Sequence, residues 1–122
     1  MDEDKVMIVM TSGTDTPRRC ATPFFMATIA AAMDYEVAMF FTIDGTQLLK
    51  KGVADTVFPK EGGKAVGDYL RDAMEAGVKF YACTASTELH DLTAADLIDG
   101  VEMVGGATFW EMADETGKLV TF

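Results

Sequence analysis

The sequence predicts an α/β fold of the flavodoxin or Rossmann type, a three-layer α/β/α sandwich in which helices cover both faces of a five-stranded parallel sheet. Segments of strand length alternate with helical segments along the whole chain, which is the pattern of parallel sheets. The strand segments are almost continuously apolar, as expected for strands buried on both faces. Small and polar residues follow the strands, so one edge of the sheet should collect them.

Five apolar segments are predicted to be the strands. The first, residues 5–11, alternates too little to be half exposed, so both of its faces should be covered. The next two also read as buried strands, and the last two are shorter. Gly117 is expected to separate the last helix from the last strand. The predicted strands are residues 5–11, 35–42, 78–83 or 78–84, 101–104 and 119–122.

The helices are placed by their capping and stop signals. Thr16 is suited to the N-cap of the first helix and Pro17 to its first turn. Gly77 is expected to end the helix before the third strand in a left-handed conformation, and Thr93 and Asp96 have capping-box spacing. The predicted helices are residues 17–33, 64–76, 93–98 and 107–115, with a shorter helix or turn at 46–51.

Length and composition indicate one globular domain over residues 1–122, because a chain of this length buries enough surface to form a stable core without disulfides or structural metals. The net charge of −10 repels phosphate backbones, so we expect no direct binding of nucleic acid. No apolar stretch approaches the roughly 20 residues of a membrane span, and the acidic start lacks the features of a signal peptide. Two cysteines without a disulfide framework favour a reducing compartment. We expect a cytoplasmic protein that does not bind membranes.

The turns that follow the strands should meet at the carboxyl edge of the sheet, where open α/β sheets bind ligands. Such turns also favour small polar residues for conformational reasons alone, so their composition has a purely structural explanation as well. The residues that we expect to line a crevice are Ser12, Gly13, Thr14, Asp44, Thr84, Ser86, Gly105 and Gly106.

Cys83 is the first candidate for chemistry, because it lies at or next to the carboxyl end of the third predicted strand and should face this crevice. Cations and helix N-termini lower the pKa of a thiol, and the helix predicted to start at Thr93 could point its N-terminus at the sulfur. His90, the only histidine, lies seven residues on and could act on the thiol as a base or a cation. The alternatives are a structural Cys83 in the core and a His90 exposed in a loop.

Cys20 is the second thiol and follows Arg18 and Arg19. The two cations and the start of a helix favour a thiolate, unless the arginines point to solvent and Cys20 packs inward. If the second strand lies between the first and the third, those two strands are about 9.6 Å apart. That separation exceeds the ~7 Å span of a disulfide, so a bond between Cys20 and Cys83 is not expected in that order.

Motifs for other chemistry are weak or missing. One His and two distant Cys have no metal-ligand spacing, and the Walker A and dinucleotide-binding motifs are absent. Residues 11–16 loosely match the phosphate-binding loop of flavodoxins, whose amides and following helix hold an anion. We expect no metal and no bound cofactor.

Taken in order, several segments resemble the DsrE/DsrF-like (DsrEFH) family, in particular its archaeal members that are often labelled predicted peroxiredoxins. The resemblance covers nearly the whole chain. It implies a parallel sheet with strand order 4-3-2-1-5, and a homo-oligomer that is a trimer or a hexamer. The segments are residues 6–13 (VMIVMTSG), 40–45 (FFTIDG), 77–83 (GVKFYAC), 97–101 (LIDGV) and 105–109 (GGATF).

The resemblance also implies a function. Some members pass sulfur as a cysteine persulfide in sulfur oxidation or tRNA thiolation, and the sulfur-accepting cysteine corresponds to Cys83. We therefore expect a small sulfur-relay protein, a sulfurtransferase-type carrier that takes sulfane sulfur from a sulfurtransferase donor and passes it to a thiol acceptor protein. Ser12 and Thr84 could donate hydrogen bonds to the sulfur. The chain has no thioredoxin-like peroxidatic motif, so peroxidase activity is not expected.

Two other functions remain open from the sequence. The crevice could bind a small anion, a nucleotide or a flavin without catalysis, on residues 12–13 and the helix start at 105–106. The chain could also be a scaffold subunit, with Trp110 and its many Phe and Met residues in an oligomer interface and Cys83 in the core. Nine Met and eight Phe suit core or interface packing.

Overall fold

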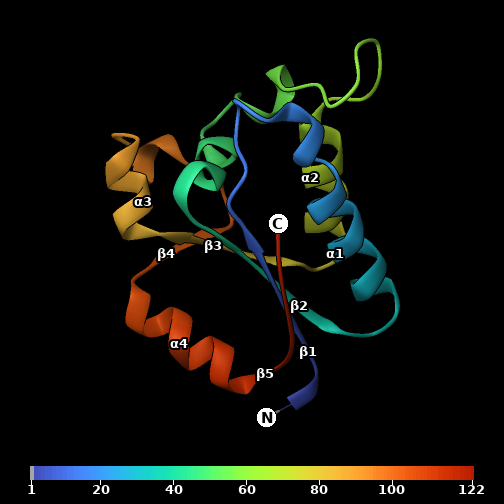
Figure 1. The fold of residues 1–122 in the computed structure, drawn as a ribbon, viewed down its shortest axis with the longest axis vertical. Helices are drawn as coiled ribbons and strands as arrows, with labels where there is room; N and C mark the ends of the chain where they lie inside the picture. Colours follow the sequence, from blue (N-terminus) through green and yellow to red (C-terminus); the bar gives the residue numbers. More distant parts are fainter. Residues whose placement is uncertain (1) are drawn as a thin grey trace.

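The computed structural model describes residues 2–122 and contains a five-stranded sheet in which every strand pair is parallel (Figure 1). The strand order β4-β3-β2-β1-β5 is the expected one, so the fold class and the strand order are confirmed. The strands are β1 (Asp2–Met10), β2 (Glu36–Phe41), β3 (Lys79–Cys83), β4 (Val101–Val104) and β5 (Thr116–Thr121).

Four α-helices flank the described sheet, with α1 and α2 side by side on one face and α4 on the other (Figure 1). Helix α3 extends from the end of β3 and packs on a 3-10 helix, Ile43–Leu49. No helix among residues 2–122 has both the length and the apolar composition that crossing a bilayer requires. The helices are α1 (Thr22–Ala32), α2 (Val66–Glu75), α3 (Thr84–Leu89) and α4 (Gly106–Glu115).

The main core lies between the sheet and helices α1 and α2. Side chains alternate along a strand, so every second residue of the sheet faces this layer. The ring centroid of Phe24 of α1 lies 5.8 Å from that of Phe41 and 5.9 Å from that of Phe80, and the two sheet rings are 5.2 Å apart. All three rings are fully buried, and each contributes roughly 1.5–3 kcal/mol by leaving water.

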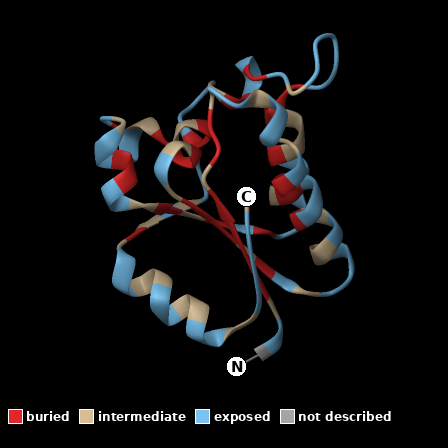
Figure 2. Cartoon of the chain, in the orientation of Figure 1, coloured by how far each residue is buried: buried red, intermediate tan, exposed pale blue. Residues whose placement is uncertain are grey.

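The second face of the sheet is covered more thinly. Met7, Phe40 and Val104 form its buried cluster, and Phe109 of α4 packs on Phe40 at 4.9 Å between ring centroids. None of the residues of α4 is buried, and Figure 2 shows this helix as a mixture of intermediate and exposed positions. This layer therefore leaves apolar surface near the strand ends in contact with solvent.

The first predicted helix is wrong at its start. Residues Pro17–Arg19 form a separate 3-10 turn, and α1 begins at Thr22. Pro23 explains the break, because proline has no N–H to donate to the preceding turn and is tolerated in the first turn of a helix. The helix that carries the apolar face therefore starts five residues later than predicted.

The segment after Cys83 was expected to be a turn and is a helix, α3. Residues outside the helix hold it in place, since Ser86 Oγ accepts the Ile43 N–H at 2.6 Å and lies 3.0 Å from Thr42 Oγ1. Tertiary contacts thus stabilise a helix that local propensity does not favour.

Three further elements test the capping predictions. Gly77 has φ +95 and follows α2, which confirms the left-handed stop. The capping box of Thr93 and Asp96 is present, but the predicted helix at 93–98 is only a 3-10 turn, Ala94–Asp96. Gly117 does not separate helix and strand, because β5 begins at Thr116 and runs through it.

Candidate functional site

The carboxyl ends of the strands meet at one edge, as parallel pairing requires. Met10 pairs with Phe41, Phe41 with Ala82, and Cys83 with Val104. The chain after each of these strands therefore starts beside its neighbours. This arrangement brings the predicted turns at 12–14, 44, 84–86 and 105–106 to the same edge of the sheet.

Cys83 is the last residue of β3 and the N-cap of α3. Its side chain belongs to the second, thinly covered face, together with Tyr81, and is half-buried against the Met7 and Phe40 cluster. The sulfur is therefore neither sealed in the main core nor fully in water.

Hydrogen-bond donors converge on the Cys83 sulfur. Burial raises its pKa, but bonds from the Ser86 N–H and hydroxyl, the Ala85 N–H and the Thr42 hydroxyl outweigh burial, so the pKa lies below its ordinary value. These donors stabilise the charged form of the thiol. Ser86 was a predicted site residue, whereas Thr42 was not.

The two hydroxyls act as a pair. Thr42 Oγ1 lies 3.0 Å from Ser86 Oγ, and either can be the donor. Ser86 Oγ also accepts the Ile43 N–H at 2.6 Å. If one hydroxyl proton bridges the two oxygens, the other stays available to the sulfur, because each hydroxyl carries a single proton.

Ile43 positions this hydroxyl pair through its N–H, and its own backbone is strained. It has φ +53, a left-handed backbone that β-branched residues rarely adopt and that costs on the order of 1–3 kcal/mol. Its N–H is bound by Ser86, and its carbonyl accepts the Thr46 hydroxyl at 3.0 Å. Such outliers concentrate at functional sites.

His90 lies at the far end of α3. Seven residue steps at 1.5 Å each place it about 10 Å along the helix from Cys83. Its Nε2 is 3.1 Å from Asp44 Oδ1, and its Nδ1 is 3.5 Å from Gln47 Nε2. The structure therefore brings His90 to Asp44 and Gln47, and its action on the thiol stays a prediction.

Gln47 fixes the tautomer of His90. The Gln47 amide oxygen accepts the Thr14 N–H and hydroxyl, both at 3.0 Å, so the amide nitrogen faces His90. An amide nitrogen only donates. His90 Nδ1 is then the acceptor, and Nε2 carries the proton that is donated to Asp44.

The loop at residues 12–14 has no room for a ligand, because Asp44 and Gln47 pack against it. A side chain at Gly13 would overlap the Asp44 carbonyl and Gln47, and the donors of Thr14 are already satisfied by Gln47. An anion on this loop would have to displace the Gln47 side chain. An open hollow of about 230 Å³ nevertheless adjoins it, lined by Thr14, Gln47, Lys50, Val53, His90 and Leu92.

The remaining predicted residues also lie at this edge. Ser12 is buried, and Thr84 is exposed as the first residue of α3. Gly105 is the N-cap of α4, and Gly106 is its first residue. Their contribution to ligand binding stays a prediction.

Cys20 packs inward and is not activated. Its thiol donates to the carbonyls of Gly13 and Thr16, both at 3.3 Å, while Arg18 and Arg19 are exposed. Burial raises the pKa of Cys20 to about 11, so the thiolate interpretation is wrong. Both cysteines are free, and β2 lies between the strands that lead to them.

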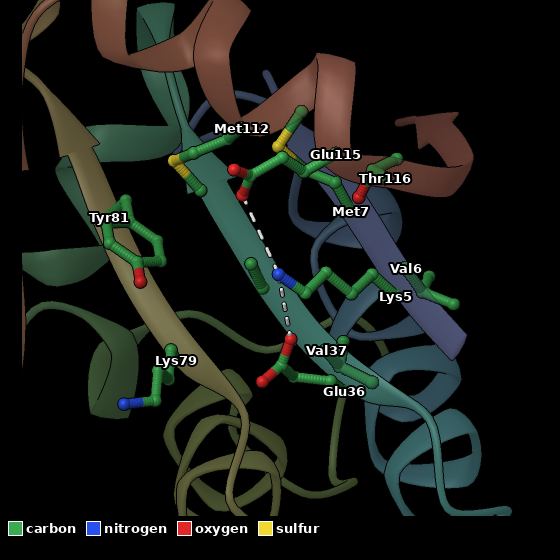
Figure 3. A pocket seen from close by; sticks show the side chains of 11 residues that line it. Lys5, Val6, Met7, Glu36, Val37, Lys79, Tyr81, Met112, Glu115 and Thr116 are labelled. Carbon is green, nitrogen blue, oxygen red and sulfur yellow. Dashed lines mark ion pairs between the residues drawn. The ribbon is translucent and has the colours of Figure 1, made fainter. Parts of the chain in front are cut away.

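A second hollow, of about 280 Å³, lies under α4 toward the other end of the strands. Figure 3 shows Lys5 extending between two carboxylates, with Nζ 3.5 Å from Glu36 Oε2 and 3.6 Å from Glu115 Oε2. It lies away from the carboxyl edge, where α/β sheets carry their chemistry. Its lining is Lys5, Val6, Met7, Glu36, Val37, Ala38, Lys79, Tyr81, Met112, Glu115 and Thr116.

Comparison with known proteins decides the family. The model of the DsrE/DsrF-like family matches residues 4–122. The chain belongs to this family.

Two relatives and two solved structures illustrate the family and its fold. The sulfur carrier protein DsrE2 of Allochromatium vinosum is 34% identical, over 95% of this chain and 96% of that protein. The uncharacterized protein MJ0760 of Methanocaldococcus jannaschii is also 34% identical, over 87% of this chain, which spans only 38% of its length. The ychN protein from E. coli has a TM-score of 0.81 at 18% identity, covering 100% of both chains. A protein of unknown function from Methanobacterium thermoautotrophicum, MTH1491, has a TM-score of 0.65 at 14% identity, covering 99% of this chain and 100% of that chain.

Sequence reasoning missed three residues of this candidate site: Thr42, Ile43 and Gln47. Thr42 was counted as the last residue of a buried strand, although its polar side chain at the carboxyl end was a usable signal. Nothing local marks Ile43 or Gln47, whose partners lie more than 30 residues away. Within residues 2–122, no three His, Cys, Asp or Glu side chains gather as a metal site.

Proposed function

We propose that this protein is a sulfur carrier that holds sulfane sulfur as a persulfide on Cys83. The observation that carries the proposal is the half-exposed thiol of Cys83, whose thiolate is stabilised by converging hydrogen-bond donors. The thiolate is the nucleophilic form of cysteine. A relative that aligns with nearly the whole of this chain is named a sulfur carrier protein, which supports the same function here.

The loading step is an exchange between two thiols. The Cys83 thiolate attacks the outer sulfur of a donor persulfide, D–S–SH. A new S–S bond forms at Cys83, the donor S–S bond breaks, and the donor leaves as the thiolate D–S⁻. Sulfane sulfur keeps its oxidation level, so no external oxidant or reductant is consumed. A thiol acceptor protein removes the sulfur by the same exchange in reverse.

The donors around Cys83 serve both states of the carrier. The amides of Ala85 and Ser86 and the hydroxyl pair of Thr42 and Ser86 stabilise negative charge on the sulfur. The same groups stabilise Cys83 as the leaving thiolate when the acceptor takes the sulfur. We place this exchange in the reducing cytoplasm, where the Cys83 thiol stays free.

Mass spectrometry of the intact protein tests the proposal. Inorganic polysulfide supplies the sulfur, and we expect a mass increase of one sulfur atom that dithiothreitol reverses. Cys83→Ser should abolish the increase, whereas Cys20→Ser should leave it unchanged because Cys20 is buried with a raised pKa. No added sulfur on the wild-type protein, or sulfur mapped by digestion to Cys20, would show the proposal to be wrong.

The carrier is also proposed to be a homo-oligomer, a trimer or hexamer built through α1. This helix is apolar on its outer side as well as its inner side, with Phe25, Met26 and Met33 between 47% and 63% exposed. A helix that is apolar all round is usually buried. A second copy of the chain is the occupant that we expect on this side.

A further inference from the structure

Three large apolar side chains are exposed on the elements that start at the Cys83 edge. Ile43 is 50% exposed, Leu89 63% and Trp110 68%. Ile43 is bonded through its N–H to Ser86, and Leu89 ends the helix that Cys83 begins. Trp110 is in the second turn of α4, and Figure 1 shows α3 and α4 diverging from the neighbouring ends of β3 and β4.

The segment of the chain that carries Leu89 and Trp110 has charges of one sign only. Residues 80–117, which build α3, β4 and α4, contain eight acidic residues and no Lys or Arg, so this third of the chain carries −8 of the net −10. Of the eight, Glu88, Asp91, Glu111 and Asp114 lie on or next to α3 and α4 and make no ion pair within residues 2–122.

We infer that the protein which exchanges sulfur with Cys83 is basic and docks on this face. The name thiol face is used here for Ile43, α3 and α4, with Cys83 between the two helices. This docking serves sulfur transfer only if the proposed carrier function holds. The partner would carry an accessible thiol, basic residues around that thiol, and an apolar surface that contacts Trp110.

The size of a protein contact suits this face. A standard interface covers about 800 Å² on each partner, a disc of about 16 Å radius. Helix α4 rises 1.5 Å per residue, so Trp110 lies about 6 Å along it from Gly106, and neighbouring strands are about 4.8 Å apart. A partner that reaches the sulfur therefore also covers Trp110, the residue type that most often dominates binding energy.

The negative charge of the thiol face disfavours nucleic acids, anionic membranes and a second copy of the chain as its binding partner. Unpaired carboxylates repel the phosphates of nucleic acids and of anionic membranes. A second copy of the chain would bring the same carboxylates against themselves, whereas the uncharged outer side of α1 has no such conflict. Opposite charge on a protein partner instead raises its association rate and fixes its orientation.

Sulfur transfer from Cys83 to the docked partner consumes no further reactant. The partner thiolate attacks the outer sulfur of the Cys83 persulfide and forms R–S–SH, and Cys83 leaves as a thiolate. The docking itself can be measured without any persulfide. For this purpose the partner is replaced by a peptide whose cysteine carries a coloured arylthiol as a mixed disulfide. The Cys83 thiolate displaces the arylthiolate and forms a disulfide with the peptide.

The experiment uses two such peptides of equal length, each with one Leu, flanked either by four Lys or by four Glu. At low ionic strength we expect the Lys peptide to react at least about tenfold faster with wild-type protein, and the difference to shrink in high salt. Equal rates for the two peptides, or a difference that salt does not reduce, would overturn the inference.

Charge reversal at matched positions separates local docking from net charge. The pair Glu88→Lys and Glu111→Lys lies on the thiol face, whereas Glu61→Lys and Glu75→Lys lies in the loop before α2 and at its end. Both pairs change the net charge by the same amount. We expect the first pair to remove the preference for the Lys peptide and the second to change it less than about twofold. Equal effects of the two pairs would overturn the inference.

Trp110→Ala tests the apolar contact. We expect several-fold slower reaction with both peptides. If the variant instead lowers the oligomeric mass of the protein in solution, a second copy covers this face and the inference is wrong. Failure of polysulfide loading with intact peptide selectivity would reject the carrier function and leave the docking face standing.

Discussion

Cys20 and Cys83 are the same side chain in opposite surroundings. The Cys20 thiol is fully buried and finds only carbonyl acceptors, so it remains a protonated donor. The Cys83 thiol is half-buried and finds donors from Thr42, Ala85 and Ser86. The difference comes from the groups that surround each sulfur, carbonyl oxygens at Cys20 and N–H and hydroxyl donors at Cys83. For this reason we propose Cys83, and not Cys20, as the nucleophile.

The hydroxyl pair beside Cys83 leads to a test of non-additivity. Either Thr42→Val or Ser86→Ala leaves one hydroxyl that can donate to the sulfur, whereas the double variant leaves none. We expect the double variant to raise the pKa of Cys83 by about one unit, because a hydrogen bond to a charged group is worth about 1.5–3 kcal/mol. Each single variant should give less than half of this rise.

The measurement is the rate of alkylation of Cys83 by iodoacetamide as a function of pH. A raised pKa reduces the thiolate fraction at neutral pH, so the double variant should react more slowly there and equally fast well above its pKa. Circular dichroism checks that Ser86→Ala, which leaves the Ile43 N–H without its acceptor, is folded. Two single effects that sum to the double effect would contradict the paired arrangement.

At the scale of elements, the loop after β1 and the 3-10 helix after β2 are locked together. Gly13 allows the two to touch, because any side chain there would meet the Asp44 carbonyl and Gln47. Gln47 in turn links Thr14 to His90. The turns at the carboxyl edge thus form a supported frame around α3.

Gly13→Ala tests this frame. We expect it to destabilise the protein by about 1–3 kcal/mol, because the added methyl group must push a backbone carbonyl aside. Gly105→Ala is the matched control, since nothing lies within 4 Å of its added methyl group and its φ of −91 suits alanine. Urea unfolding measures the free energy of unfolding of both variants. Equal values would show that the loop accommodates the added methyl group without strain.

At the scale of the whole molecule, the two sides of the sheet have different surfaces. The outer side of α1 is apolar and uncharged, whereas α3 and α4 are acidic with separate apolar side chains. This division suits a molecule that assembles with copies of itself on one side and meets a basic partner on the other.

A pair of lysine substitutions tests the assembly side. Met33 and Leu89 are both 63% exposed and both lie at the C-terminal end of a helix, where a cation is tolerated. We expect Met33→Lys to reduce the solution mass to that of one chain, because it places a charge in the apolar interface. Leu89→Lys should leave the mass of the oligomer unchanged, and light scattering with size exclusion measures both. A wild-type monomer would contradict the proposed assembly.

The sequence by itself determined the layered fold, the buried strands and the position of Cys83 at a strand end. These features depend on the local order of apolar and polar residues, which sets the period and burial of each element. The left-handed stop at Gly77 was predictable for the same reason, because it depends on one residue and its neighbours. The resemblance of five segments to a known family gave the strand order.

Only the tertiary structure decided what surrounds the sulfur. Thr42 and Ser86 are 44 residues apart in the chain and Gln47 and His90 are 43 apart, and each pair meets because parallel strands bring their carboxyl ends to one edge. The helical state of residues 84–89 and the left-handed Ile43 depend on the same contacts. A pattern of neighbours along the chain cannot carry this information, since these hydrogen bonds join residues that only the aligned strands bring together.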